Sequence, residues 1–357
     1  MQSIPSHLDI PASNHPTDSV SCFSWLSFQQ RAFLGVSSWD SKVRVYEYEE
    51  KLGTTFLEQK TCFDTPDPCL SIAFFPGLPL LIIGCIDGSL SISDMSNPSE
   101  TTTLGKHDDA IKDIHILENG IILSTSYDKT IRVWDLNQKN EVAKIQFDDK
   151  IYCSDFQLDS LKFVAGFSND KLLICNIMDL QSQRTSDLPY VFSPLGSGSQ
   201  LSAIAISKHD NALGLTSSDG RANVSTLVQN SNGRFRLDNI VSFKCHKLDP
   251  GQGGNTSSYK ILFPVHSIGF HPEKRHSLFT AGGEGSIHFW DSQRKDRLKT
   301  LSFSGVPVTK AKLNDNGTLL AYALGYDWAK GIEGAHSYNN SISVHKIQPN
   351  EYVHSNL

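Results

Sequence analysis

The sequence contains no run of 18 apolar residues, so no segment is expected to span or insert into a membrane. Its N-terminus, residues 1–16, is polar and lacks the apolar stretch of a secretory signal. The seven cysteines form no C-x-x-C pair, which argues against both a zinc site and a disulfide framework. Together these absences favour an intracellular, reducing compartment.

Signatures of catalysis are missing as well. The chain has neither the G-x-S-x-G elbow of many hydrolases nor a phosphate loop of the G-x-x-x-x-G-K-[ST] kind. We therefore expect no enzymatic activity, no catalytic residues, no metal ion and no cofactor. The formal net charge of −6 argues against a nucleic-acid-binding surface that covers the whole protein, but it does not exclude a local basic patch.

Six acidic residues recur at tight turns, and each is followed by an apolar run that ends near a Trp-Asp-like pair. The clearest copy is STSYDKTIRVWD, residues 124–135. The six turn acids, separated by 47, 41, 42, 49 and 65 residues, are Asp40, Asp87, Asp128, Asp170, Asp219 and Glu284. A period of about 40–50 residues with this signature is typical of WD-repeat β-propellers.

Each repeat predicts one propeller blade built from short strands. The expected strands of the six regular copies are 20–25, 32–37, 42–46; 69–74, 80–85, 90–93; 111–116, 121–125, 131–134, 141–146; 151–156, 163–167, 172–176; 201–206, 212–216, 222–226; and 265–270, 277–281, 286–290. A seventh, irregular copy has strands at 308–313, 318–324 and 341–345 but no Asp-Gly turn. The prediction is an all-β, seven-bladed WD-repeat β-propeller.

The propeller is expected to form a single domain over residues 1–357. Because an open blade would leave an unpaired strand edge, a closed ring needs a seam. We expect the N-terminal segment 1–16 to close the last blade, with residues 7–10 as its outer strand.

Blade three carries a polar cluster that resembles the structural tetrad of WD repeats: His107, Ser124, Asp128 and Trp134. Ser, His and Asp together also suggest a hydrolase triad. The structural interpretation is favoured, because an Asp in a tight turn bonded to a His ahead of the first strand satisfies buried donors and fixes the blade.

Exposed residues at the turns are the candidates for binding. Trp39 and Tyr127 each precede a turn acid and are therefore expected at the rim rather than in the core, where they either anchor an extended peptide or shield the neighbouring turns. In FKCHK, residues 243–247, alternation predicts a half-buried strand that presents Lys244 and His246 on one face.

Two insertions break the regular spacing. Residues 230–260 include a Gly-rich stretch typical of a flexible surface loop. In GYDWAKGIEG, residues 325–334, Tyr326 and Trp328 either pack the loop onto blade seven or present a binding surface, and packing is favoured for Trp328.

Over about residues 20–347, the chain resembles the Rae/Gle-type mRNA-export factor of the nuclear pore. The motifs that carry this resemblance are SSWD (37–40), KHDDAIKDIH (106–115), SDGR (218–221), FKCHK (243–247), FHP (270–272), TAGGEG (280–285), FWD (289–291) and YDWAKG (326–331). The Bub-type spindle-checkpoint propeller shares the SSWD-like turn and the FKCHK-like strand, and YDWAKG favours the export branch. The chain departs from the family pattern at Tyr127, Lys247 and Glu284, where the family shows Trp, Arg and Asp.

The resemblance implies a non-enzymatic scaffold that holds a GLEBS-type peptide with adjacent glutamates across one face. Its partner would be a GLEBS-motif nucleoporin, and its role would be mRNA export in the nucleus, at the nuclear envelope and pore, and in the cytoplasm. Trp39 and Tyr127 would be the aromatic anchors, and the cations for the acidic pair would be Arg221, Lys244 and Lys247. RNA binding through a local basic patch, together with the nucleoporin, is also implied.

Two alternatives stay open on the sequence. The first is a spindle-checkpoint adaptor that binds peptides of checkpoint kinases. The second is a generic WD-repeat scaffold, such as a substrate receptor of a ubiquitin ligase, for which Trp39, Tyr127 and Lys244 would be irrelevant to binding.

Overall fold

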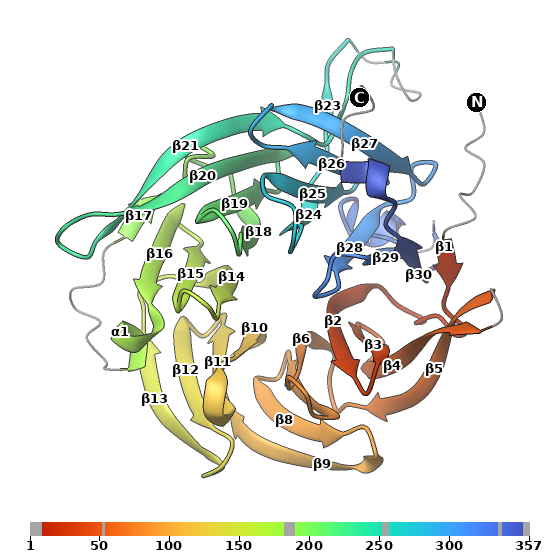
Figure 1. The fold of residues 1–357 in the computed structure, drawn as a ribbon, viewed down its shortest axis with the longest axis vertical. Helices are drawn as coiled ribbons and strands as arrows, with labels where there is room; N and C mark the ends of the chain where they lie inside the picture. The colour runs from red at the N-terminus through yellow and green to blue at the C-terminus, as the bar shows by residue number, and fades with distance from the viewer. Residues whose placement is uncertain are drawn as a thin grey trace.

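Seven four-stranded antiparallel sheets surround a central channel in the computed structural model, which describes residues 9–51, 54–181, 190–251, 256, 258–334 and 338–352. Figure 1 shows the sheets arranged as propeller blades. Neighbouring innermost strands pack on one another all the way around, in the order β2, β6, β10, β14, β18, β24, β28 and back to β2. The predicted seven-bladed WD-repeat propeller is confirmed.

The first four blades follow one another along the chain. Blade one contains β2 (Val20–Phe28), β3 (Arg31–Ser38), β4 (Lys42–Lys51) and β5 (Thr54–Asp64). Blade two contains β6 (Cys69–Phe74), β7 (Leu80–Cys85), β8 (Ser89–Asp94) and β9 (Asn97–Lys106). Blade three contains β10 (Ile111–Ile116), β11 (Ile121–Ser126), β12 (Thr130–Asp135) and β13 (Asn140–Gln146). Blade four contains β14 (Ile151–Gln157), β15 (Lys162–Phe167), β16 (Lys171–Asn176) and β17 (Tyr190–Phe192).

The remaining blades include the seam. Blade five contains β18 (Leu201–Ile206), β19 (Ala212–Ser217), β20 (Arg221–Gln229) and β21 (Phe235–Lys244). Blade six contains β24 (Val265–Phe270), β25 (Ser277–Gly282), β26 (Ser286–Asp291) and β27 (Asp296–Ser302). Blade seven contains β28 (Val308–Leu313), β29 (Leu319–Leu324), β30 (Ser341–Lys346) and β1 (Asp9–Pro11). Outside the blades lie β22 (Lys247–Leu248), β23 (Ile261–Leu262), α1 (Ile177–Gln181), η1 (Glu118–Gly120), η3 (Gly331–Gly334) and η4 (Pro349–Tyr352).

The hydrophobic core is divided among the interfaces between blades. Ile131 and Phe163, for example, belong to one buried cluster between blades three and four, and Leu34 and Val344 belong to one between blades one and seven. Alternating residues of each strand point to opposite faces of its sheet, so each blade contributes apolar side chains to both neighbours. No blade can therefore bury its apolar surface alone.

The N-terminal strand β1 pairs with β30 and forms the outer strand of blade seven. Ile10 is buried between blades one and seven, and Ala12 forms a parallel bridge to Leu57 of blade one. The first and last strands of the chain thus meet at one seam (Figure 1). Residues 7 and 8 of the expected outer strand, like the rest of 1–8, lie outside the described residues.

Charged hydrogen bonds join the two chain ends at this seam. The ring of His345 on β30 lies 2.6 Å from Asp9 Oδ1 through Nδ1 and 3.0 Å from the Glu351 carboxylate through Nε2. Lys299 Nζ lies 2.5 Å from the same Glu351. Burial lowers the pKa of His345, but the hydrogen bonds to the two carboxylates outweigh it and raise the pKa to about 9.

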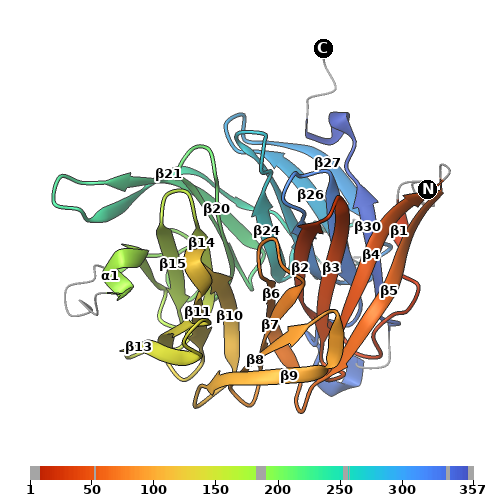
Figure 2. The ribbon, with the colours of Figure 1, turned by 60° about the horizontal axis from the view of Figure 1, so that its bottom comes forward.

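Two expectations need correction. Cys69 and Cys85 are register partners on β6 and β7 and form a disulfide, although the cysteine pattern argued against a disulfide framework. The stretch 230–260 is not simply an insertion, because it begins with a turn after β20 and then supplies β21, the outer strand of blade five (Figure 2). Residues 252–255 of its Gly-rich part lie outside the described residues. Among the described residues, no helix has the length and apolarity needed to cross a membrane.

We predict that protonated His345 stabilises the closed ring. A folded-state pKa of about 9, above the usual 6.5, adds stability that is complete below pH 6.5 and is lost as the pH rises through 9. The contribution amounts to about 3 kcal/mol. In thermal melts over this pH range, the stability of the wild-type protein relative to that of His345→Gln should fall by this amount as the pH rises. His209→Gln, which alters an exposed histidine of blade five, should follow the wild type. Parallel pH profiles for wild type and His345→Gln would contradict the prediction.

Candidate binding site

The turns between the second and third strands of all blades lie at one face of the ring, because each sheet runs in the same order and direction outward from the channel. These turns hold the predicted acids. In blade three, Asp128 Oδ2 lies 2.9 Å from His107 Nδ1, and His107 Nε2 lies 2.7 Å from Ser124 Oγ. Trp134 donates from Nε1 to Ser124 Oγ at 2.8 Å. The four predicted tetrad residues are therefore in contact.

Hydrogen-bond directions explain what this cluster does. Because the Asp128 carboxylate can only accept, it takes the Nδ1 proton of His107, and Nε2 of the neutral ring then accepts from Ser124 Oγ, which itself accepts from Trp134. Burial raises the pKa of Asp128, but the hydrogen bonds from His107 and Thr130 outweigh it and hold the pKa below its usual value. His107 and Ser124 are almost completely buried, so the network joins the segment before β10 to the turn after β11 and reaches no solvent.

A second network of this kind occurs in blade six, and the sequence interpretation missed it. His246 is fully buried, with Nδ1 2.5 Å from Glu284 Oε1 and Nε2 2.9 Å from Thr280 Oγ1, which also accepts from Trp290. The expected exposed face formed by Lys244 and His246 is therefore wrong, because β21 ends at Lys244 and the chain then turns inward.

Glu284, which replaces the usual Asp, contacts a second histidine as well. Its Oε1 lies 3.2 Å from His288 Nε2. Burial raises the pKa of Glu284, but the hydrogen bonds from His246 and His288 lower it to about 2. Burial also lowers the pKa of His246. The longer acid thus contacts two imidazoles through Oε1, whereas its buried Oε2 has no hydrogen-bond partner among the described residues.

Trp39 and Tyr127, the two predicted aromatic anchors, line one pocket of about 300 Å³. Trp39 is 43% exposed, and Tyr127 packs edge-on against Tyr152 with ring centroids 6.1 Å apart. The rest of the lining comes mainly from the first residues of innermost strands, among them Lys112 and Lys310. The pocket therefore lies at the mouth of the central channel.

The YDWAKG loop completes the rim of this pocket. Tyr326 is only 5% exposed, its hydroxyl donates to the Gly331 carbonyl at 2.6 Å, and its carbonyl accepts from Ser19 Oγ at 2.7 Å. Trp328 is 48% exposed, lines the pocket and has a positive φ of 60°. The expectation that Trp328 packs the loop down is wrong, because Tyr326 does so and Trp328 remains available.

The three predicted cations lie on the same face but do not line this pocket. Arg221 and Lys244 are register partners at the ends of β20 and β21, and Arg221 Nε lies 2.8 Å from Asp219. Lys247 Nζ lies 3.1 Å from Asp249. Lys244 is exposed and has no ion pair within the described part of the chain. The structure thus brings together the two aromatics and separately groups the cations around blade five.

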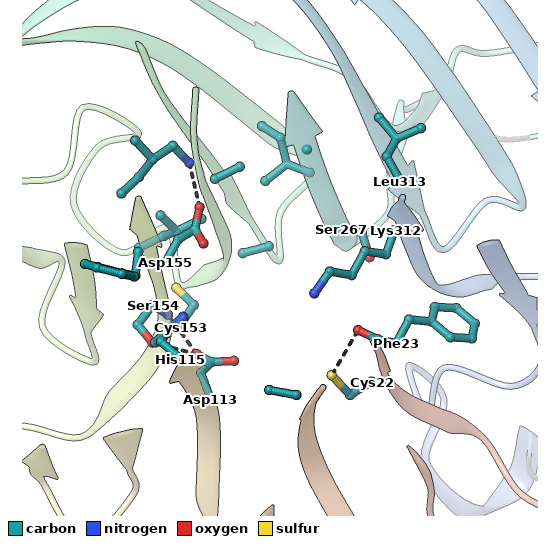
Figure 3. A pocket seen from close by; sticks show the side chains of 18 of the residues that line it. Cys22, Phe23, Asp113, His115, Cys153, Ser154, Asp155, Ser267, Lys312 and Leu313 are labelled. Atoms are coloured by element: carbon teal, nitrogen blue, oxygen red, sulfur yellow. Dashed lines mark hydrogen bonds between the residues drawn. The ribbon is translucent and has the colours of Figure 1, made fainter. Parts of the chain in front are cut away.

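The central channel continues below the pocket as a cavity of about 630 Å³. Three residues, Lys112, His266 and Lys310, line both spaces, so the two are continuous. Figure 3 shows Asp113, His115 and Asp155 on one side of the channel and Lys312 on the other. Burial raises the pKa of Asp155 to about 6 and lowers that of His115 to about 4.

Comparisons with known proteins agree with this architecture. A family model described as WD domain, G-beta repeat matches residues 98–135, which run from blade two into blade three. The poly(A)+ RNA export protein of Schizosaccharomyces pombe is 30% identical over 95% of this chain and 89% of its own length. The chain belongs to the Rae/Gle-type family of WD-repeat mRNA-export factors.

Two further relatives allow the identity to an export factor to be compared with the identity to a checkpoint protein. Protein Rae1 of Drosophila melanogaster is 29% identical over 91% of this chain and 90% of its own length. Mitotic checkpoint protein bub-3 of Caenorhabditis elegans is 25% identical over 91% of this chain and 90% of its own length. The export-factor family is therefore matched at higher identity, along nearly the whole chain, than this checkpoint relative.

We predict that His107→Ala lowers the free energy of unfolding by about 2–4 kcal/mol, because it removes the buried hydrogen bonds that join Ser124 to Asp128 and leaves a cavity in their place. Chemical denaturation of the purified chain measures this loss. Gln138→Ala, at an exposed turn of the same blade, serves as the control and should be neutral. An unchanged unfolding midpoint in His107→Ala would contradict the assigned tetrad.

Proposed function

We propose that this protein is a non-enzymatic, peptide-binding propeller that docks a GLEBS-like segment of a nucleoporin and supports mRNA export through the nuclear pore. It acts in the nucleus, at the nuclear envelope and pore, and in the cytoplasm. RNA binds through a local basic patch together with the nucleoporin. The observation that carries the proposal is the aromatic pocket at the channel mouth, in a chain whose relatives are named as RNA-export proteins.

The geometry of the pocket suits an extended peptide. Trp39, Tyr127 and Trp328 come from the turns of blades one, three and seven, so a segment that contacts all three must lie across the face. Large aromatic side chains that are partly exposed and fixed by their backbone are typical anchors of binding sites. Arg221, Lys244 and Lys247 then offer positive charge farther along the same face, where acidic residues of the peptide can pair with them.

Several features support a binding role without catalysis. The Ser124 hydroxyl donates to His107 as a triad serine would, but it is fully buried and also accepts from Trp134, so a substrate has no access to it. The second histidine cluster, in blade six, is likewise enclosed by its own hydrogen bonds. The exposed groups at the channel mouth are mainly aromatic rings and amines, which suit recognition.

The checkpoint relative supplies the alternative partner, a peptide of a checkpoint kinase. Calorimetric titration of the full chain with a nucleoporin GLEBS peptide and with a checkpoint-kinase peptide separates the two. We expect the nucleoporin peptide to bind more tightly. Tighter binding of the kinase peptide would move the protein to the checkpoint branch, and binding of neither would contradict the proposal and leave a generic scaffold.

We predict that Trp39→Ala weakens nucleoporin-peptide binding by at least 2 kcal/mol, or about 30-fold, because it removes a central aromatic anchor. The same titration measures the loss. Phe56→Ala is the matched control, since Phe56 is 48% exposed on β5 of the same blade but does not line the pocket. Equal affinities of Trp39→Ala and wild type would remove Trp39 from the site.

We also predict that the double variant Lys244→Glu/Lys247→Glu weakens the peptide by several kcal/mol, because acidic peptide residues would then meet like charges. Lys139→Glu/Lys295→Glu makes the same change of charge in turns on the opposite face and should bind normally. Thermal melts check that both variants fold. An unchanged affinity in the first variant would exclude these lysines from the interface.

A further inference from the structure

The channel mouth contains a cation that the predicted site did not include. Lys310 lies on β28 and lines both the aromatic pocket and the channel below it. No ion pair or hydrogen bond joins its side chain to any of the described residues. Burial, and next to it the charge of Lys112, lowers the pKa of Lys310 to about 8. Lys310 is thus a partly dehydrated amine without a counter-ion at the base of an aromatic pocket.

The acidic groups near the mouth are engaged elsewhere. Asp327 Oδ2 lies 3.2 Å from His266 Nε2, and its other oxygen accepts from the Ala329 amide at 3.1 Å. Asp113 accepts from the Ser154 amide at 2.8 Å and lies 3.5 Å from Lys112 Nζ. Within the described part of the chain, Lys310 therefore makes no ion pair, and the nearby Asp113 acts on it only through its longer-range charge.

We propose that Lys310 binds a carboxylate side chain of the docked peptide, which enters the channel mouth between Trp39, Tyr127 and Trp328. This inference rests on the proposed function and names the group that selects for an acidic residue at the centre of the site. The pocket volume of about 300 Å³ equals that of about ten water molecules, which is room for one side chain but not for a folded segment.

The chemistry favours a carboxylate for two reasons. A charge-assisted hydrogen bond to the amine replaces the hydration that Lys310 has lost, and such a bond is stronger where water is excluded. A peptide that packs on the apolar rim also shields its own carboxylate from water, whereas a free inorganic anion has no attached chain to cover it. Arg221, Lys244 and Lys247 do not line this pocket, so they cannot take the same role there.

Lys312 provides a matched control on the same strand. It lies two residues further along β28, lines the channel but not the aromatic pocket, and faces the side of Asp113 and Asp155 (Figure 3). A peptide side chain that stops at the mouth contacts Lys310 and leaves Lys312 unaffected. The two lysines therefore separate a specific contact from a general effect of positive charge in the channel.

The test is titration of the full-length chain with a nucleoporin GLEBS peptide and with versions in which each of its adjacent glutamates is changed to glutamine. Lys310→Met should weaken the parent peptide by about tenfold or more, and Lys312→Met by less than about twofold. With the wild-type protein, one of the two glutamine peptides should bind more weakly than the parent peptide by a similar factor. With Lys310→Met, that peptide should bind no more weakly than the parent, since both changes remove the same contact.

The pH dependence gives a second reading. Since the pKa of free Lys310 is about 8, affinity of the wild type should fall as the pH rises above 8, and Lys310→Met should lack this fall. The ionisable groups that act on Lys310 or share its pocket are Lys112 and Asp113 on β10, Cys22 on β2, His266 on β24, Lys312 on its own strand, and Tyr127, Tyr326 and Asp327 in the turns. All are retained in Lys310→Met. The difference between the two pH profiles therefore reports Lys310.

Four outcomes would overturn the inference. Equal affinities of Lys310→Met and wild type, or a glutamine effect that persists in Lys310→Met, would contradict the role of Lys310 and leave the proposed function standing. Inorganic phosphate that binds at the mouth as tightly as the peptide, in a Lys310-dependent way, would make this a site for free anions. Failure of the wild-type chain to bind the parent peptide would overturn the proposed function, and the inference with it.

Discussion

The pairing of β1 with β30 closes the ring, and the rest of the structure depends on that closure. Each blade buries its apolar faces only against its neighbours, so an open seam would expose the cluster between blades seven and one and leave a free strand edge. The backbone pairing is short, over Asp9–Pro11, and His345 reinforces it by bridging Asp9 to Glu351 near the C-terminus. Burial of Ile10 supplies the apolar part of the same joint.

A closed ring makes a rigid face, and buried hydrogen bonds fix the turns of that face that carry Tyr127 and Trp328. In blade three, the network of His107 ties the turn after β11 to the preceding segment, and this turn carries Tyr127. In blade seven, Tyr326 holds the loop that presents Trp328. The polar groups that resemble catalytic residues thus serve to position aromatic side chains that have no buried role of their own.

The sequence was sufficient to predict the fold, because the spacing of turn acids and of the Trp-Asp-like pairs reflects one blade per repeat. It also singled out Trp39 and Tyr127, since a residue beside a turn acid lies at the rim. The role of His246 was hidden, because 38 residues including an insertion separate it from Glu284. Lys310 and the pair of Cys69 and Cys85 depend on register and depth along the channel, which composition and spacing do not reveal.

We propose that the bound peptide lies across the channel mouth on the aromatic rim. A crystal structure of the full chain with a nucleoporin GLEBS peptide would show where the peptide binds. We expect it to contact Trp39, Tyr127 and Trp328, with one carboxylate within hydrogen-bond distance of Lys310. A peptide bound along the outer strands of a blade, or on the opposite face of the ring, would contradict it.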